Sequence, residues 1–330
     1  MHMGDALVSP VVGGALIAAT SGVMTYSIKK LDKDSLKSKV AYMGVAGAFV
    51  FAAQMINFSI PGTGSSGHIG GGLLLAILLG PSAGFLAMAS ILLIQALFFA
   101  DGGLLAYGAN VINMGLFTCF LAYPLIYQAF LRLKGLKMNT RIALGSFFGV
   151  VIGLQLGALA VVIETVVSGR TELPFSTFLL FMLPIHLAIG AVEGVITATI
   201  AIFLHQQQPA LLYQTQSNKM IGYKNKIVIG IMILTVFIGG VASLYASGSP
   251  DGLEWSISNV SQGFLVHSEG SFLQGIQDKL AILPDYSFKA NQEGTAIGTS
   301  FSGIIGSFAT LILVISVALI IRRASNQRGA

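Results

Sequence analysis

Long apolar stretches separated by short polar ones dominate the hydrophobic pattern of this chain. Most of them reach the ~20 residues that a helix needs to cross a bilayer. They lie at residues 7–28, 40–57, 70–79, 82–100, 104–131, 142–167, 176–204, 226–247 and 302–321. The third, GGGLLLAILL, is short and ends at Gly80-Pro81, so we expect a tilted or partly buried helix that lines a cavity. The pattern predicts an all-α polytopic membrane protein with nine spans.

A polar segment divides these spans into two blocks, with seven spans before it and two after it. We therefore expect residues 1–205 to form a seven-span helical bundle and residues 206–225 to form a linker. Residues 226–330 then form a two-span C-terminal module. Its two spans are joined by the segment 248–301, which is expected to be a loop outside the membrane.

The basic residues predict how the chain is oriented. If the N-terminus lies outside, all but Arg170, Lys279 and Lys289 of the 18 Lys and Arg residues fall in loops on the inner side. Loops on the cytoplasmic side of a membrane carry an excess of Lys and Arg. We therefore expect the N-terminus outside, the C-terminus inside and the linker in the cytoplasm. This distribution also accounts for the net charge of +5 without a nucleic-acid partner.

Composition supports the membrane class. The chain is 54% hydrophobic and only 9% charged, whereas soluble domains contain about 25% charged residues. The first residues lack the positive region that opens a secretory signal. We therefore expect the N-terminus to be retained.

Two histidines of the first block, His2 and His68, fall on the outer side in this topology. A terminal amine, the main-chain nitrogen of residue 2 and Nδ1 of a histidine at residue 2 close a five- and a six-membered ring around one metal ion. An imidazole from His68 would complete a square of four nitrogens, which suits nickel(II) or copper(II), and imidazole also suits cobalt(II). The alternative is that a histidine at position 2 has no special role.

Several polar residues within or beside the spans have both a functional and a structural interpretation. His186 and Glu193 lie seven residues apart on one helix face, and ionisable groups at membrane depth are functional candidates. They could equally satisfy polar groups between helices. Asn110 is either a hydrogen-bond partner of a metal site or a contact between helices, as are Asn113, Gln95 and Gln54. Asp101 either orients a ligand imidazole or belongs to an outer turn.

Four stretches of the first block resemble a known family. They are MHMGDALVSP at the start, NFSIPGTGSSGHIGGGLLLAILLGP (57–81), ADGGLLAYGANVINMG (100–115) and HLAIGAVEGVITA (186–198). In these the chain resembles the substrate-binding membrane subunit of cobalt/nickel energy-coupling-factor transporters, the CbiM/NikM family. Two departures are visible: Gly4 stands where the family usually has proline, and GTGSSGH is one residue longer than the common form.

The resemblance implies that Met1, His2 and His68 are metal ligands and that no cofactor is needed, because the ion is the transported substrate. We expect nickel to be the preferred ion, because four nitrogens in one plane favour its low-spin state, with cobalt next. Residues expected beside the ligands are Asn57, Ser66, Asp101, Asn110, His186 and Glu193.

The C-terminal module has a resemblance of its own. SPDGLEWSI (249–257) and LPDYSF (283–288) resemble the small companion subunit with a PDGLE motif, here fused to the first block. The resemblance implies that this module assists metal loading. Asp251 and Glu254 could attract cations, but Ser-Pro-Asp-Gly is typical of a turn, and we favour a turn followed by a helix N-terminus.

The expected partners follow from what the sequence contains. There is no G-x-x-x-x-G-K-[ST] motif, so the chain has no phosphate-binding loop of that type. The resemblance implies separate cytoplasmic ATPase subunits and a membrane coupling subunit, in the plasma membrane of a bacterium or archaeon. Gly14, Ala18 and Gly22 present small residues at four-residue spacing, which suits either docking of the coupling subunit or internal packing.

Two rival functions remain open at this point. GTGSSGH contains Gly-x-Ser-Gly, so Ser66 as nucleophile and His186 as base would make a rhomboid-like intramembrane serine protease. Alternatively, Glu193 and His186 would form the proton relay of a proton-coupled secondary metal transporter. That transporter would work without ATP or partner subunits.

Overall fold

The computed structural model describes the chain except for residues 1, 32, 208–224, 261–271, 290–295 and 328–330. Its helices and strands are α1 (Pro10–Lys30), α2 (Lys33–Gln54), β1 (Phe58–Ile60), β2 (Ser65–Gly67), α3 (Gly72–Leu79), α4 (Pro81–Phe99), α5 (Tyr107–Val111), a π-helical stretch (Ile112–Tyr127), α6 (Gln128–Leu131), α7 (Met138–Ser168), α8 (Phe175–Gln207), α10 (Asn225–Gly240), α11 (Gly252–Val260), α12 (Phe272–Leu280) and α13 (Ala296–Gln327). Short 3₁₀ turns lie at Asp5–Leu7, Ala242–Tyr245 and Pro284–Tyr286.

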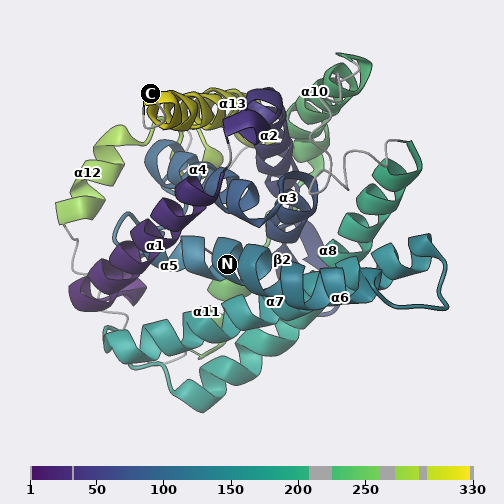
Figure 1. The fold of residues 1–330 in the computed structure, drawn as a ribbon. Helices are drawn as coiled ribbons and strands as arrows, with labels where there is room; N and C mark the ends of the chain where they lie inside the picture. The colour runs from purple at the N-terminus through teal and green to yellow at the C-terminus, as the bar shows by residue number, and fades with distance from the viewer. Residues whose placement is uncertain (1, 32, 208–224, 261–271, 290–295, 328–330) are drawn as a thin grey trace.

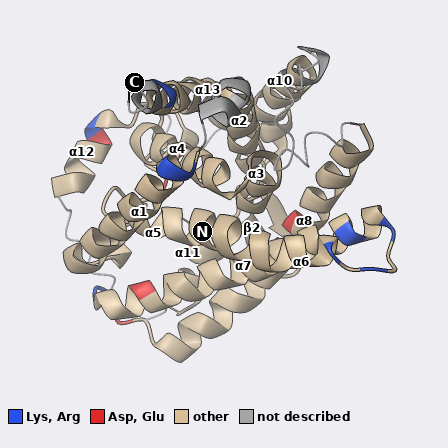
Figure 2. Ribbon diagram, in the orientation of Figure 1, with Lys and Arg blue, Asp and Glu red and all other residues tan. Residues whose placement is uncertain are grey.

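Within the described residues, seven helices are long and apolar enough to cross a membrane. They are Pro10–Lys30, Pro81–Phe99, Tyr107–Leu131, Met138–Ser168, Phe175–Gln207, Val228–Tyr245 and Ala296–Arg323. Two predicted spans are shorter: the apolar part of α2 is Val40–Gln54, and α3 has 8 residues. Figure 2 shows a ribbon that is almost entirely uncharged, with Lys and Arg prominent in the loop beyond α6. The chain is therefore an all-α multi-pass membrane protein, as predicted.

Helices α3 and α4 form the centre of the fold (Figure 1). The Gly80-Pro81 pair ends one helix and begins the next, and a Cβ at Gly84 would lie 2.9 Å from backbone atoms of α3. Every residue of α3 is buried. In the apolar stretch of α4 that could span a membrane, 83% of the residues are buried, compared with 17% in the corresponding stretch of α1. The third apolar stretch is therefore a short helix as predicted, but it is completely buried rather than partly buried.

The C-terminal module packs directly on the first block. Helix α13 lies against α2 and α4, and α10 lies against both α2 and α13 (Figure 1). The close approach depends on glycines: a Cβ at Gly303 would lie 2.3 Å from the carbonyl oxygen of Gly239, and one at Gly306 would lie 2.0 Å from Phe51. Such contacts let helices pack closely where lipid supplies no hydrophobic drive.

We expect Gly306→Leu to destabilise this packing. The new side chain has no room beside Phe51, and overfilling a packed core costs about 1–3 kcal/mol. Thermal unfolding of the purified protein in detergent measures the effect. Gly230→Leu is the matched control, because nothing lies within 4 Å of a Cβ there. Equal unfolding temperatures for the two variants would contradict this account of the packing.

The two segments that the sequence predicted to be outer loops contain regular secondary structure. The expected loop 58–69 contains an antiparallel hairpin, in which Phe58 pairs with Gly67 and Ser59 with Ser66. The expected loop 248–301 contains α11 and α12. Its start runs along the hairpin, where the backbone N–H of Ser247 donates to the Asn57 carbonyl at 2.8 Å. Most of the predicted linker 206–225 lies outside the described residues.

Candidate metal centre

The N-terminal segment is bound to the turn before α5 and to α5 itself. The backbone N–H of Met3 donates to Asn110 Oδ1 at 2.7 Å, and Asn110 Nδ2 donates back to the Met3 carbonyl at 3.1 Å. Met3 is completely buried. The Asp5 carboxylate accepts two hydrogen bonds from the main chain just before α5, at 2.8 and 3.1 Å. These contacts fix the chain on the C-terminal side of His2; Met1 lies outside the described residues.

His2 and His68 meet face to face. Their ring centroids lie 5.3 Å apart and the ring planes differ by 15°. Burial, with the positive charge of the terminal amine, lowers the pKa of His2 to about 3 and that of His68 to about 4, and His2 lowers the pKa of His68 further. Both imidazoles are therefore neutral at neutral pH, which is the form that binds metal ions.

A chain of amides determines which nitrogen of His2 carries the proton. The carbonyl of Gly70 can only accept, so Gln54 must present its Nε2 to it, at 2.8 Å. Gln95 Nε2 then donates to Gln54 Oε1 at 2.9 Å, which leaves Gln95 Oε1 to accept from His2 Nε2 at 3.1 Å. Nε2 therefore holds the proton, and Nδ1 keeps its lone pair. Nδ1 is the atom that closes a six-membered chelate ring with the main-chain nitrogen of residue 2.

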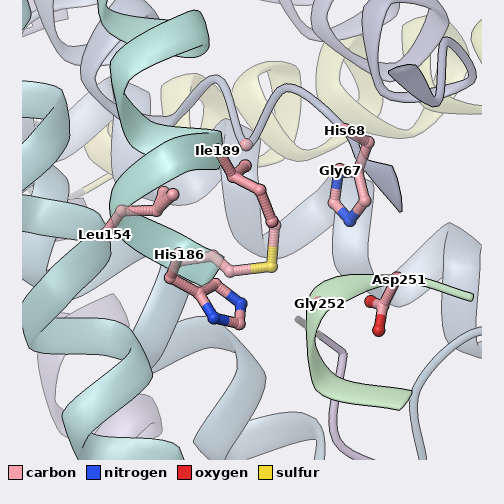
Figure 3. A pocket seen from close by; sticks show the side chains of 9 residues that line it. Gly67, His68, Leu154, His186, Ile189, Asp251 and Gly252 are labelled. Carbon is pink, nitrogen blue, oxygen red and sulfur yellow. The ribbon is translucent and has the colours of Figure 1, made fainter. Parts of the chain in front are cut away.

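His68 and His186 carry their proton on the other ring nitrogen, Nδ1, because in each of them Nδ1 faces a main-chain carbonyl. Nδ1 of His68 faces the Ile69 carbonyl at 3.3 Å, and Nδ1 of His186 faces the Met182 carbonyl at 2.8 Å. In each ring Nε2 is left with its lone pair, and that of His186 has no hydrogen-bond partner among the described residues. His68, His186 and Asp251 surround the same small pocket (Figure 3). Its volume of about 20 Å³ is enough for one water molecule.

Glu193 holds the segment that follows His68. Its two carboxylate oxygens accept from the backbone N–H groups of Gly70 and Gly71, at 2.8 and 2.9 Å. Gly71 has a φ of +76°, in the left-handed region that favours glycine, and it is the residue immediately before α3. Glu193 is almost completely buried. The carboxylate thus joins α8 to the start of α3, two residues beyond the candidate ligand.

Ser66 and Asn57 contact the C-terminal module. Ser66 is completely buried, its hydroxyl donates to the Ser249 carbonyl at 2.7 Å, and its N–H donates to the Pro250 carbonyl at 2.8 Å. Asn57 accepts from the module through its backbone carbonyl. The module therefore extends the hairpin on the strand that leads into His68.

Asp101 lies directly beside His2. Its Oδ1 is 3.3 Å from His2 Nδ1, and its Oδ2 accepts a hydrogen bond of 2.5 Å from the hydroxyl of Tyr286. Burial raises the pKa of Asp101, and the hydrogen bond from Tyr286 opposes that rise. Tyr286 comes from the C-terminal module and was not among the predicted site residues; its only signal in the sequence is its place in LPDYSF.

The carboxylates of the PDGLE stretch cap a helix. Asp251 Oδ1 accepts from the backbone N–H groups of Leu253 and Glu254, and Glu254 Oε2 accepts from the N–H of Asp251. This reciprocal arrangement is a helix N-terminal capping box. The turn and helix start that the sequence favoured are confirmed. A Cβ at Gly252 would lie 2.9 Å from Ile189 and 3.0 Å from the His186 ring, so a larger residue there would force these side chains to shift.

Among the residues that the structure describes, no three His, Cys, Asp or Glu side chains converge closely enough to hold a metal ion by themselves. A metal site at His2 and His68 therefore needs donors other than those side chains. Main-chain nitrogens of residues 1 and 2 are donors of that kind.

Comparison with known proteins assigns both parts of the chain. Residues 2–211 match the family described as cobalt uptake substrate-specific transmembrane region, and residues 225–323 match the PDGLE domain. A putative fused nickel transport protein NikMN of Archaeoglobus fulgidus is 31% identical over 95% of this chain and 96% of its own length. The fused nickel transport protein NikMN of Rhodobacter capsulatus is 28% identical over the full length of both chains.

A solved structure supports the same assignment. The crystal structure of a transition metal transporter is 32% identical in sequence, with a TM-score of 0.55, and the match covers 66% of this chain and all of that one. These relatives are named as transport proteins and not as enzymes. Ser66, the nucleophile of the protease interpretation, donates its hydroxyl hydrogen bond to the Ser249 carbonyl. The protease interpretation is therefore rejected. The chain is a bacterial or archaeal plasma-membrane protein that belongs to the family of cobalt uptake substrate-specific transmembrane regions, with a fused PDGLE domain.

Proposed function

We propose that this chain captures a divalent transition-metal ion as the substrate-specificity subunit of an ATP-driven energy-coupling-factor transporter. The proposed ligands are the Met1 amine, the main-chain nitrogen of residue 2, His2 Nδ1 and His68 Nε2. The observation that supports this most strongly is the pair of facing imidazoles, 5.3 Å apart, whose hydrogen bonds leave those two nitrogens with lone pairs. Metal–nitrogen bonds of about 2 Å put both rings within reach of one ion.

We propose nickel as the preferred ion, with cobalt next. Four nitrogens in one plane favour nickel(II), and imidazole ligands also suit cobalt(II). Relatives of this chain are named nickel transport proteins in some organisms and cobalt transport proteins in others. Binding is expected to release a proton, because the main-chain amide must lose one to bind the metal.

The proposed topology places the site at the outer surface. The N-terminus and the hairpin lie outside and the C-terminus lies inside, as the basic residues predict. The units are the seven-span metal-binding subunit (1–205), the cytoplasmic linker (206–225) and the PDGLE-type module (226–330). We propose that the module assists loading by holding the strand before His68, where it accepts hydrogen bonds from Ser66.

The partners in this proposal are a membrane coupling subunit and cytoplasmic ATPase subunits. Helix α1 offers the coupling subunit a surface of small residues at Gly14, Ala18 and Gly22, all of them exposed. Nothing in the described part of the chain lies within 4 Å of a Cβ at either glycine, which favours docking over internal packing. Reorientation of the whole subunit, driven by the ATPases, would then release the ion inside.

We expect Ala18→Leu to weaken assembly with the coupling subunit and leave metal binding unchanged. The larger side chain prevents close approach of a second helix. Co-purification with the partner subunits, beside nickel titration of the isolated chain, measures both properties. Val195→Leu on the exposed face of α8 is the control. Unchanged assembly of the Ala18→Leu protein would show that α1 does not form the interface.

Two measurements test the proposed function. Isothermal titration of the purified chain with nickel and cobalt measures capture, and uptake into vesicles with and without partner subunits and ATP measures transport. The proposal predicts tight binding by the chain alone and uptake only by the energised complex. Uptake by the chain alone would instead favour the proton-coupled secondary transporter. The contacts of Glu193 favour the first outcome, because its carboxylate is engaged with Gly70 and Gly71.

A further inference from the structure

Helix α12 lies beside the end of a membrane-spanning helix. Gln277 is buried, and its Nε2 donates to the carbonyls of Ala96 and Gly102, at 2.9 and 2.7 Å. Just after α12, the backbone N–H of Ile282 donates to the Phe98 carbonyl at 2.9 Å. Helix α4 has 19 residues, about the length that crosses a bilayer, so its last turn lies near the boundary between hydrocarbon and water. These contacts place α12 at that boundary.

Helix α12 exposes its apolar face and buries a polar side chain. Phe272, Ile276 and Leu280 follow one another at four-residue spacing, so they lie on one face of the helix. Phe272 is 83% exposed and Leu280 is 49% exposed, whereas Gln277 is buried against α4. A surface helix of a soluble domain has the reverse arrangement, with its apolar face toward the core. The apolar face of α12 is therefore left for a partner that is itself apolar.

The opposite face of α12 is polar and has no net charge. Gln274 and Asp278 lie four residues apart on that face, and both are exposed. Lys279 lies beside the apolar face, where a lysine can lay its stem on apolar surface and keep its charge in water. Asp278 and Lys279, side by side in Figure 2, offset each other. Attraction to a charged partner is therefore not what the sequence of this helix favours.

The exposed apolar surface continues from α12 onto a spanning helix. In the segment after α12, the Tyr286 ring stacks on Phe99 at the end of α4, with centroids 4.9 Å apart. The Phe288 ring lies 5.5 Å from Phe301 in the second turn of α13. The end of α4 and the start of α13 therefore lie at the same level as this segment. Ile297, at the start of α13, is 70% exposed, and exposed apolar residues of a spanning helix face lipid.

We propose that α12 binds the membrane surface, with Phe272, Ile276 and Leu280 inserted at the boundary between lipid headgroups and acyl chains. Helices of this kind bury their apolar face about 5–10 Å into that boundary. Lipid is favoured over a second protein because the exposed face continues onto α13, and because α12 lies at the edge of the molecule (Figure 1). The helix thus anchors the C-terminal module in the membrane beside the end of α4. This inference is independent of metal capture, because it rests on α12 and its contacts alone.

The test measures which face of α12 contacts lipid in the full chain, reconstituted in phosphatidylcholine vesicles. Phe272→Cys and Leu280→Cys are labelled with a nitroxide, and Gln274→Cys and Asp278→Cys are the matched controls on the polar face. Power saturation measures how each label is reached by oxygen, which concentrates in lipid, and by chromium oxalate, which stays in water. We expect the ratio of the two to be about threefold or more higher on the apolar face than on the polar face. Ile312→Cys, at an exposed position of α13, gives the ratio for a label within the membrane.

The outcomes separate lipid from water and from protein. The unsubstituted protein measures background labelling at Cys119, which is completely buried. Equal ratios on the two faces would place α12 in water and overturn the inference. Labels on the apolar face that neither reagent reaches would show that protein covers it, which also overturns the inference. Should Phe272→Cys not fold, Leu280→Cys decides by the same measurement.

A second set of vesicles tests the nature of the attraction. These vesicles contain phosphatidylglycerol, an anionic lipid, in addition to phosphatidylcholine. Because α12 has no net charge, we expect the same ratios in both sets of vesicles. A high ratio on the apolar face only with the anionic lipid would show attraction by charge, and the proposed insertion of the apolar face would be wrong.

Discussion

Replacing His2 with alanine is expected to lower the affinity for nickel more than 100-fold. The substitution removes the only side-chain nitrogen that forms a chelate ring with the main chain at residue 2. Even hydrogen-bond partners of metal ligands typically cost about 10- to 100-fold when mutated, so loss of a ligand should cost more. His68→Ala should have a similar effect, because it removes the fourth nitrogen. Isothermal titration of the purified variants with nickel measures both losses.

The control for these variants is His205→Ala. His205 lies near the C-terminal end of α8, far along that helix from His186. Its substitution should leave nickel affinity within twofold of the unsubstituted protein. Full binding by His2→Ala, with normal thermal unfolding, would contradict the ligand assignment directly.

Removing the Glu193 carboxylate is expected to have the second largest effect. Glu193→Ala leaves the buried N–H groups of Gly70 and Gly71 without their acceptor, at about 1–3 kcal/mol each. The segment after His68 then loses its connection to α8. We expect a lower unfolding temperature and an affinity for nickel reduced at least tenfold. Thermal unfolding and nickel titration measure the two effects.

Two further variants isolate the role of Glu193. Glu193→Gln keeps one oxygen acceptor and should lie between the alanine variant and the unsubstituted protein in both measurements. Glu172→Ala removes an exposed carboxylate and should change neither. If Glu193→Ala is less stable yet binds nickel with full affinity, the carboxylate supports the fold without positioning His68.

Much of the fold followed from the apolar pattern. Uninterrupted apolar runs specified the long helices, and Gly80-Pro81 marked the break between α3 and α4, because proline cannot continue a helix and the glycine there has a φ of +84°. The hairpin was not predicted. Its strands have 3 residues each and are stabilised partly by the distant C-terminal module, so their sequence carries little local signal.

The candidate site was predicted in part. The opening residues and the charge distribution predict that His2 and His68 lie on one side of the membrane. That they meet depends on contacts between residues far apart in the chain: Asn110 holds Met3 across 107 residues, and Glu193 holds Gly70 across 123. The GTGSSGH segment, as it stands in this chain, brings the His68 ring to within 5.3 Å of the His2 ring.

Tyr286 shows the limit of such reasoning. It contacts Asp101 from 185 residues away, and its backbone conformation is one that tyrosine does not favour by itself. A tyrosine in a segment between two apolar helices has no local pattern that distinguishes it from a surface residue. Only the docking of the C-terminal module on the first block brings it to the site.

The most direct test of the central claim is nickel titration after selective transamination of the N-terminus. This reaction converts the terminal amine of Met1 to a ketone and leaves the lysines intact, and mass spectrometry verifies the conversion. The proposed chelate predicts that binding is lost in proportion to the converted fraction. Undiminished nickel affinity in fully converted protein would contradict the claim that the amine, His2 and His68 together hold the ion.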